Sequence, residues 1–315
     1  MAAEQLIEAR SLYRYYDRHC AVAGLDLELH QGEVLGLLGP NGAGKSSTLD
    51  MLSGTLAPSA GQIQIKGIDL LDRPRAAKRH LGYLPEQPPL HPDLSVDEYL
   101  TYCARLHRLR WREIAPAIAN AKHRCGLQAT GERLVGNLSR GYQQRVGIAQ
   151  AIIHTPAVVI LDEATTGLDP IQIQEIRQLI RDLGEAHSVI VSTHILPEVQ
   201  VVCDRVQIIN EGRTVFNDTL EGLERRHAAP RLLVGFDHPP DPASLEALPG
   251  VTGVKALADG RLRIDHEPGQ APTEALTQRA VAEGWGLNEL TPERVTLEQI
   301  FTDLVYRQEP EAHAA

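Results

Sequence analysis

The chain has 315 residues, of which 43% are hydrophobic, and 41 acidic against 31 basic residues give it a formal net charge of −10. This apolar content is that of an ordinary globular protein, and the length predicts a large domain with room for a second, smaller one. The acidic balance, together with an aromatic content of only 4%, argues against a protein that coats DNA or RNA, so we expect no nucleic-acid partner.

The sequence carries no signal for a membrane span or for export. No stretch approaches the roughly 18 to 20 consecutive apolar residues of a transmembrane helix, and charges begin at the fourth residue, where a signal peptide would need an apolar core. The four cysteines are scattered and form no CxxC pair, which is typical of a reducing compartment. We therefore expect a soluble chain in the cytoplasm.

Short apolar runs alternate with longer amphipathic ones over roughly the first 225 residues, which predicts an α/β fold with a largely parallel sheet. The near-continuous apolar runs at residues 33–39, 157–163 and 188–194 are typical of strands covered on both faces. Residues 206–212 and 213–216 predict a hairpin that turns at Glu211 and Gly212. Residues 92–147 have helical spacing and indicate a helical subdomain inserted into the α/β core.

The composition shifts near residues 225–230, and a second pattern follows. Strands are predicted at residues 231–236, 251–258, 261–266 and 285–290, and helices at 242–248, 273–284 and 296–306. The order βαββαβ is that of a small α+β, ferredoxin-like domain. We therefore predict a first domain over residues 1–226, a C-terminal accessory domain over 231–307 and a frayed tail over 308–315.

A phosphate-binding loop is predicted directly after the first buried strand. Residues 39–46 fit the pattern G-x-x-x-x-G-K-[ST], between that strand and an amphipathic helix. Glycines let backbone N–H groups converge on phosphates, and the helix N-terminus adds partial positive charge. We expect Lys45 to reach the β and γ phosphates of ATP and the Ser46 hydroxyl to bind Mg²⁺. The predicted ATP-binding residues here are Gly39, Pro40, Asn41, Gly42, Ala43, Gly44, Lys45, Ser46 and Ser47.

Two adjacent carboxylates, Asp162 and Glu163, end the buried strand at residues 157–163. Neighbouring side chains in a strand point in opposite directions, so the two should have different roles. Asp162 suits a Mg²⁺ ligand, directly or through water. Glu163 suits the catalytic residue that orients or deprotonates an attacking water.

Together these motifs resemble those of the ATP-binding subunit of an ABC transporter, over roughly residues 5–225. The segment NLSRGYQQR, residues 137–145, resembles the signature of that family and lies just upstream of the acidic strand. The resemblance implies a head-to-tail dimer in which the signature of one subunit contacts the ATP held by the other. The signature residues are Ser139, Arg140, Gly141 and Tyr142, and the second subunit is either another copy of this chain or a paralogue.

The resemblance assigns roles to further residues. Tyr16 matches the aromatic residue that stacks on adenine, with Tyr13 and Tyr15 as alternatives. Asp169 matches the D-loop, which crosses the dimer interface. His194 matches the switch histidine that contacts the γ-phosphate.

The sequence departs from the family's pattern at three places. Glu86 stands where the family has the Q-loop glutamine and Gln87 follows it, so either residue is a candidate for contact with Mg²⁺ or water. Arg140 and Tyr142 replace the usual Gly and Gln of the signature. Ala164 replaces the Pro that commonly follows the catalytic Glu. The residues predicted to perform hydrolysis are all retained.

Among ABC proteins, this chain most resembles ATPase subunits of ABC-2 type systems, such as gliding-motility-like, copper-site-maturation and multidrug exporters. The resemblance implies an ATPase at the cytoplasmic face of the membrane that powers an integral-membrane permease on a separate chain. The alternatives are a soluble ABC ATPase of translation or DNA repair, and an ATP-dependent regulator without transport. Translation factors usually carry two nucleotide domains in one chain and repair proteins long coiled coils, and neither feature is predicted here.

Overall fold

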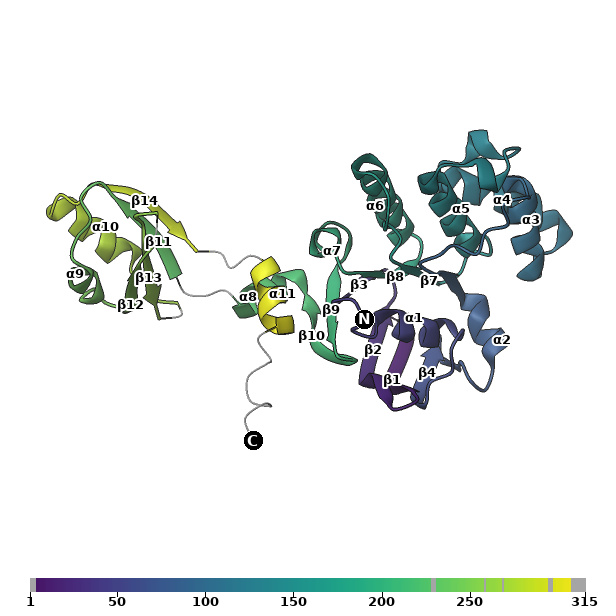
Figure 1. The fold of residues 1–315 in the computed structure, drawn as a ribbon, viewed down its shortest axis with the longest axis horizontal. Coiled ribbons are helices and arrows are strands. Elements are labelled where there is room, and N and C mark those ends of the chain that lie inside the picture. Colours follow the sequence, from purple (N-terminus) through teal and green to yellow (C-terminus); the bar gives the residue numbers. More distant parts are fainter. Residues whose placement is uncertain (1–3, 228–230, 258, 268, 294–296, 307–315) are drawn as a thin grey trace. The chain divides into compact units, whose positions relative to one another are not determined.

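The computed structural model describes residues 4–227, 231–257, 259–267, 269–293 and 297–306. This part of the chain divides into two compact units (Figure 1). The N-terminal unit contains residues 4–220 and the end of the last helix from Leu304, and the C-terminal unit contains residues 221–303. Within the described ranges, no helix is long and apolar enough to cross a membrane.

The central sheet of the N-terminal unit has six strands in the order β10-β9-β3-β8-β7-β6. All neighbours from β9 to β6 are parallel, and β10 pairs with β9 in an antiparallel hairpin. Every residue of β3, β7 and β8 is buried, as the apolar runs predict. The hairpin turns where predicted, at Glu211 and Gly212, which both have positive φ, the backbone that tight hairpin turns need. The strands are β3 (Val34–Leu38), β6 (Leu81–Leu84), β7 (Val158–Asp162), β8 (Ser188–Thr193), β9 (Arg205–Asn210) and β10 (Arg213–Thr219).

A second, antiparallel sheet of four strands, in the order β2-β1-β4-β5, was not predicted. The pairing of β1 with β2 shifts register four times, which disturbs the strict alternation of apolar and polar residues by which a half-buried strand is recognised. The strands are β1 (Gln5–Tyr16), β2 (His19–His30), β4 (Ala60–Ile65) and β5 (Ile68–Asp69).

Both sheets share one apolar core with helix α1 (Lys45–Ser53). This core includes Leu27 of β2, Leu37 of β3, Leu49 of α1, Ile63 of β4 and Ile160 of β7. Helix α1 is thereby fixed against β3, so the loop that joins them is held between two rigid elements. Such a loop can keep a fixed geometry for ligand binding.

Residues 92–147 fold mainly into helices, as their spacing predicts. Helix α3 begins with a capping box in which the Ser95 hydroxyl accepts from the Glu98 backbone N–H and the Glu98 carboxylate accepts from the Ser95 N–H. The remaining helices of the N-terminal unit cover the sheet or connect its strands. The helices are α2 (Pro74–Ala77), α3 (Val96–Leu106), α4 (Trp111–Arg124), α5 (Arg140–Ile152), α6 (Pro170–Gly184), α7 (Leu196–Val202) and α8 (Leu220–His227), the last crossing into the C-terminal unit.

The C-terminal unit contains an antiparallel sheet of four strands in the order β12-β13-β11-β14. Its own core includes Leu232, Ile264, Leu276 and Trp285, and Phe236 packs edge-on against the Trp285 ring. The predicted strands and helices are all present, with ends that differ by a few residues. They are β11 (Arg231–Phe236), α9 (Pro242–Glu246), β12 (Val251–Ala256), β13 (Leu262–His266), α10 (Thr273–Ala282), β14 (Leu287–Pro292) and α11 (Leu297–Tyr306). The predicted tail, residues 308–315, lies outside the described residues.

Candidate active site

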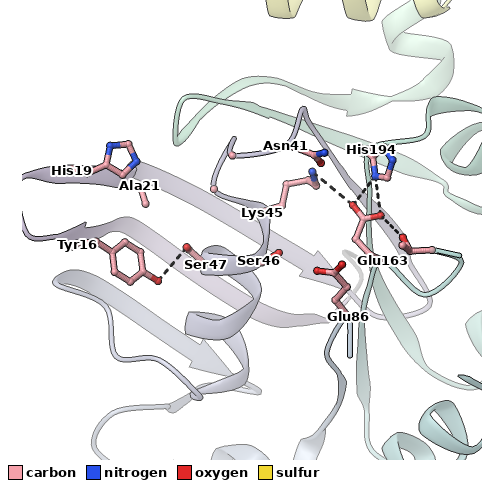
Figure 2. A pocket seen from close by; sticks show the side chains of 13 residues that line it. Tyr16, His19, Ala21, Asn41, Lys45, Ser46, Ser47, Glu86, Glu163 and His194 are labelled. Atoms are coloured by element: carbon pink, nitrogen blue, oxygen red, sulfur yellow. Dashed lines mark hydrogen bonds and ion pairs between the residues drawn. The ribbon is translucent and has the colours of Figure 1, made fainter. Parts of the chain in front are cut away.

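A cavity of about 550 Å³ lies where the parallel strands β3, β7 and β8 end (Figure 2). One wall is the loop after β3 and the start of α1, and it contributes Asn41, Gly42, Gly44, Lys45, Ser46 and Ser47. The segments that follow β6, β7 and β8 contribute Glu86, Glu163, Thr166 and His194. Strands β1 and β2 contribute Tyr16, His19 and Ala21. Segments far apart in the sequence thus meet at the carboxyl edge of the sheet, where α/β proteins bind ligands.

The loop from Gly39 to Gly44 needs glycine at both of its ends, because a larger residue would clash with neighbouring backbone there. Gly44 has φ +99°, and a Cβ atom there would lie 2.4 Å from the carbonyl oxygen of Ala21. A Cβ atom on Gly39 would lie 2.3 Å from the carbonyl oxygen of Ile209. Helix α1 begins directly after this loop, so its first N–H groups have no acceptor within the helix and face the cavity mouth. This arrangement is an anion-binding site.

Lys45 is buried at the base of this loop. Its Nζ donates to the carbonyl oxygens of Gly39 at 2.8 Å and Pro40 at 3.2 Å, and lies 3.8 Å from Oε1 of Glu163. Burial lowers the pKa of Lys45, and the nearby carboxylates of Glu163, Asp162 and Glu86 oppose that change. A phosphate in the loop would offer this ammonium group a full negative charge in place of two carbonyl dipoles, which is a stronger partner.

Glu163 is held in place by three side chains, as Figure 2 shows. Nδ1 of His194 lies 3.0 and 2.9 Å from its two carboxylate oxygens, and the Thr166 hydroxyl donates to Oε2 at 3.1 Å. The third side chain is Lys45. Glu163 also has φ +48°, a left-handed backbone that is uncommon for a residue other than glycine and often marks a functional position. The structure thus brings the predicted catalytic pair, Glu163 and His194, into direct contact.

Asp162 is buried at the end of β7 and, unlike Glu163, does not line the cavity directly. Its Oδ1 atom has no hydrogen-bond partner among the described residues, and neither has the hydroxyl of Ser192 on the neighbouring strand. Burial raises the pKa of Asp162, while the hydroxyls of Ser192 and Ser46 act in the opposite direction. The unpartnered Oδ1 of Asp162 and the nearby Ser46 hydroxyl are oxygen ligands of the kind that Mg²⁺ prefers. Asp162 and Ser46 therefore fit a magnesium ion.

Of the three candidate tyrosines, Tyr16 lines the cavity. Its hydroxyl lies 3.3 Å from Oγ of Ser47, and the Arg14 guanidinium lies 4.7 Å from its ring centroid. Tyr13 and Tyr15 instead lie parallel to each other, with ring centroids 6.3 Å apart. His19 lines the same cavity and was missed, because it belongs to no motif and reaches the site only through the pairing of β1 with β2.

The structure also separates the two Q-loop candidates. Glu86 lines the cavity at the ends of β3, β7 and β8, which we call the nucleotide cavity. Its charge acts to raise the pKa of both Lys45 and Asp162. Gln87 does not line that cavity. It lines, with Glu86, a neighbouring cavity of about 280 Å³.

The signature residues lie outside the nucleotide cavity. Ser139 is the N-cap of α5, but its side chain makes no capping hydrogen bond in the described structure. Gly141 and Tyr142 line a separate cavity of about 270 Å³ together with Asp169, whose carboxylate caps α6 by accepting from the N–H groups of Ile171 and Gln172. One chain therefore does not bring its phosphate loop and its signature together.

Arg140, which departs from the usual signature, packs against Gly167 in the predicted D-loop. A Cβ atom on Gly167 would lie 2.4 Å from an Arg140 guanidinium nitrogen, and Gly167 has φ +73°. The larger side chain at position 140 is thus accommodated by a glycine on the neighbouring segment. The two predicted interface segments are in contact within one chain.

Glu198 is a buried residue of α7 that sequence reasoning missed. Its carboxylate accepts from the hydroxyls of Thr165 at 2.6 Å and Thr193 at 2.7 Å, and lies 3.6 Å from the Arg177 guanidinium. Thr165 lies two positions after Glu163, and Thr193 directly precedes His194. Glu198 therefore joins the two segments that carry the predicted catalytic pair. The available signal was a single acidic residue in a mainly apolar helix, LPEVQVV.

Fold and site together define a P-loop protein that binds a nucleoside triphosphate. Residues 22–166 match the protein family described as ABC transporter. The bacitracin transport ATP-binding protein BcrA of Bacillus licheniformis is 32% identical over 302 residues, which are 95% of this chain and 97% of BcrA. The uncharacterized ABC transporter ATP-binding protein YxlF of Bacillus subtilis is 36% identical over 221 residues, 70% of this chain and 73% of YxlF.

Among solved structures, that of CbiO1 from Clostridium perfringens, described as part of the ABC transporter complex CbiONQ, has a TM-score of 0.63 and 27% identity. The match covers 71% of this chain and 94% of CbiO1. The chain therefore belongs to the ABC transporter family, as an ATP-binding subunit of the ABC-2 type. It binds and hydrolyses ATP to energise transport, which confirms the prediction from the sequence.

Proposed function

We propose that two nucleotide units form a head-to-tail dimer with ATP between them and that this dimer drives a permease on a separate chain. The observation that carries the proposal is the separation of the signature from the nucleotide cavity within one chain. The uncapped Ser139 side chain and the free start of α5 form an anion site that needs a phosphate from elsewhere. A second subunit, either a copy of this chain or a paralogue, supplies it. ATP-dependent dimerisation, argued in the Discussion, tests this directly.

In the nucleotide cavity, the loop N–H groups and Lys45 hold the phosphates, and Tyr16 stacks on the adenine. Ser46 and Asp162 hold Mg²⁺, which when bound neutralises charge on the phosphate oxygens. Glu86 faces the same region and is the residue we assign to the Q-loop role, in contact with Mg²⁺ or the attacking water.

Glu163 orients and deprotonates the attacking water, and His194 fixes the position of that carboxylate. The water oxygen forms a bond to the γ-phosphorus while the bond from phosphorus to the bridging oxygen breaks, which releases phosphate and ADP. The proton of the water passes to Glu163. His194 also contacts the γ-phosphate, so loss of that phosphate changes the contacts of the residue that positions the base.

The chain acts at the cytoplasmic face of the membrane, where it docks on the permease. The name of one relative, a Nod factor export ATP-binding protein of Burkholderia orbicola that is 34% identical, supports export as the direction of transport. The cavity of about 280 Å³ beside Glu86 and Gln87 lies between the sheet and the helical segment. We expect conformational changes of the ATP cycle to pass to the permease through these residues and the helical segment.

Lys45→Ala is expected to weaken ATP binding roughly ten- to hundredfold, because it removes a charge-assisted contact of about 1.5–3 kcal/mol. Equilibrium titration with a fluorescent ATP analogue measures this. Lys255→Ala, which removes an exposed lysine from β12, is the control and should bind like the wild type. Wild-type affinity in a folded Lys45→Ala protein would contradict the assignment of the phosphate loop.

We further propose that the C-terminal unit is a ferredoxin-like accessory domain that folds separately and does not bind the catalytic nucleotide. The strand order β12-β13-β11-β14 and the separate apolar core support this. We assign the accessory domain residues 231–307, after a nucleotide-binding domain of residues 1–226 whose helical subdomain is residues 92–147. The compact C-terminal unit differs from this assignment at both ends, because it begins at residue 221 and ends at residue 303.

A chain ending at residue 226 is expected to remain folded and to bind ATP with unchanged affinity, because every residue that lines the cavity lies before that point. Circular dichroism and the same ATP titration check this. An insoluble truncated chain would show that the domain boundary is wrong.

A further inference from the structure

The turn between α3 and α4 presents a basic and aromatic surface that the nucleotide chemistry does not use. No acidic residue occurs between Glu98 and Glu113, although acidic residues outnumber basic ones in the chain as a whole. The same stretch contains four arginines, at positions 105, 108, 110 and 112, and a tryptophan at 111. We call the exposed residues Tyr102, Arg105, Leu106, Arg108, Trp111 and Arg112 the arginine–tryptophan turn.

Large apolar side chains in this turn lie open to solvent. Trp111 is 79% exposed, Leu106 63% and Tyr102 44%. Each comes from an amphipathic helix whose other face is buried, as Leu100 and Cys103 of α3 and Ile114 of α4 are. The exposed tryptophan therefore does not result from a poorly packed helix. The turn that precedes Trp111 has a left-handed residue, Arg108, with φ +60°.

The arginines of the turn are available for an anionic partner. Of the four arginines between residues 105 and 112, only Arg110 forms an ion pair within the described part of the chain, with Glu113 at 4.0 Å. The backbone N–H of Arg110 also donates to the Glu113 carboxylate at the start of α4. Arg105 lies with its guanidinium carbon 5.7 Å from the Trp111 ring centroid, a cation–π contact that leaves its N–H groups exposed. Arg108 and Arg112 are exposed as well.

We propose that this turn binds the anionic headgroups of a phospholipid membrane. Tryptophan and tyrosine favour the interface between headgroups and acyl chains, and arginines beside them bind lipid phosphates. A chain of net charge −10 is repelled by an anionic surface, so contact requires a local basic patch such as this one. Nucleic acid fits less well, because one exposed tryptophan is no platform for successive bases.

This inference goes beyond the proposed function, because the lipid contact is made by the chain itself and not through the permease. Vesicles without permease therefore test it independently of transport and of ATP hydrolysis. Each arginine near an anionic surface contributes about fivefold in partition coefficient, so loss of three should weaken binding about a hundredfold.

The first experiment is co-sedimentation of the full chain with vesicles of phosphatidylglycerol and phosphatidylethanolamine, compared with vesicles of phosphatidylcholine alone. We expect binding to the anionic vesicles only, and its loss in 0.5 M salt, a concentration chosen to screen exposed charges over a few ångströms. Absence of binding to anionic vesicles, or equal binding to neutral ones, would overturn the proposal.

Tryptophan emission locates the contact, because the chain has only two tryptophans. Trp285 is buried in the core of the C-terminal unit, so in Trp285→Phe the emission reports Trp111 alone. We expect a blue shift when anionic vesicles are added, as the Trp111 ring leaves water. An unchanged spectrum in a chain that sediments with the vesicles would place the contact elsewhere and overturn the proposal. Should Trp285→Phe fail to fold, quenching of the wild type by a water-soluble quencher, with and without vesicles, gives the same readout.

The matched variants are Arg105→Gln/Arg108→Gln/Arg112→Gln and the charge-matched control Arg73→Gln/Arg75→Gln/Arg79→Gln. The control arginines are equally exposed but lie in a segment that also contains Asp69 and Asp72. We expect the first triple variant to lose vesicle binding about a hundredfold, with unchanged ATP hydrolysis, and the control to bind like the wild type. Equal losses of vesicle binding in the two variants would show that binding depends on the net charge of the chain and not on this turn. Binding that appears only when the permease is present would assign the turn to a protein partner. Either result would overturn the lipid assignment.

Discussion

Glu163→Gln is expected to lower the rate of phosphate release by about 10²- to 10⁴-fold while ATP binding remains at the wild-type level. The amide keeps the size of the side chain but cannot accept the proton of the attacking water. The expected loss in rate is the typical contribution of a general base. Binding survives because Lys45 and the loop N–H groups, which hold the phosphates, are unchanged. Phosphate release and ATP titration on the same preparation measure the two effects. Wild-type hydrolysis in this variant would refute the catalytic role of Glu163.

The same variant tests the dimer, because ATP that is bound but not hydrolysed keeps the closed state populated. In the proposed dimer each ATP molecule also contacts the signature of the other subunit, so ATP binds the closed form more tightly than the open one and shifts the equilibrium toward it. We expect light scattering coupled to size exclusion to show a dimer of Glu163→Gln with ATP and a monomer without it.

Ser139→Glu, added to Glu163→Gln, is the control for that dimer. Its carboxylate would face the γ-phosphate of the other subunit, and juxtaposed like charges across an interface cost several kcal/mol. ATP binding by the monomer should be unchanged, since Ser139 does not line the nucleotide cavity. We expect no dimer. An ATP-dependent dimer in this double variant would contradict the head-to-tail arrangement.

Glu198→Ala is expected to lower the free energy of unfolding by about 3 kcal/mol, because it leaves Arg177 without its buried counter-charge. The buried hydroxyls of Thr165 and Thr193 lose their acceptor as well. The segments that carry Glu163 and His194 then lose the hydrogen bonds that join them through Glu198, so hydrolysis should fall at least about tenfold even at temperatures where the protein remains folded. Chemical denaturation and phosphate release at saturating ATP measure the two effects.

The control for Glu198 is Glu175→Ala, on the exposed face of α6. Glu175 forms a surface ion pair with Arg145 at 2.8 Å, and exposed pairs contribute only about 0–1 kcal/mol. This variant should retain stability and activity. If Glu198→Ala lost stability but kept full hydrolysis in the folded state, Glu198 would have a structural role alone.

The sequence by itself determined the parts of the site that are local in the chain. Residues 39–46 form a phosphate loop because their glycines, lysine and serine act within one strand, one turn and one helix start. The sequence places Asp162 and Glu163 side by side at the end of a strand, but β7 ends at Asp162 and Glu163 has φ +48°, so the left-handed backbone and not strand alternation separates the two side chains. The buried strands could be predicted because a strand covered on both faces needs an uninterrupted apolar run.

Only the tertiary structure decided the contacts between segments distant in the chain. Tyr16 and Glu86 line the cavity while their neighbours do not, which depends on how strands β1 and β6 lie beside the loop after β3. The contact of Arg140 with Gly167 and the hydrogen bonds of Glu198 to Thr165 and Thr193 arise from packing between elements. A side-chain pattern specifies which face of an element is buried, but not which residue of another element it meets, because that depends on register and packing angle.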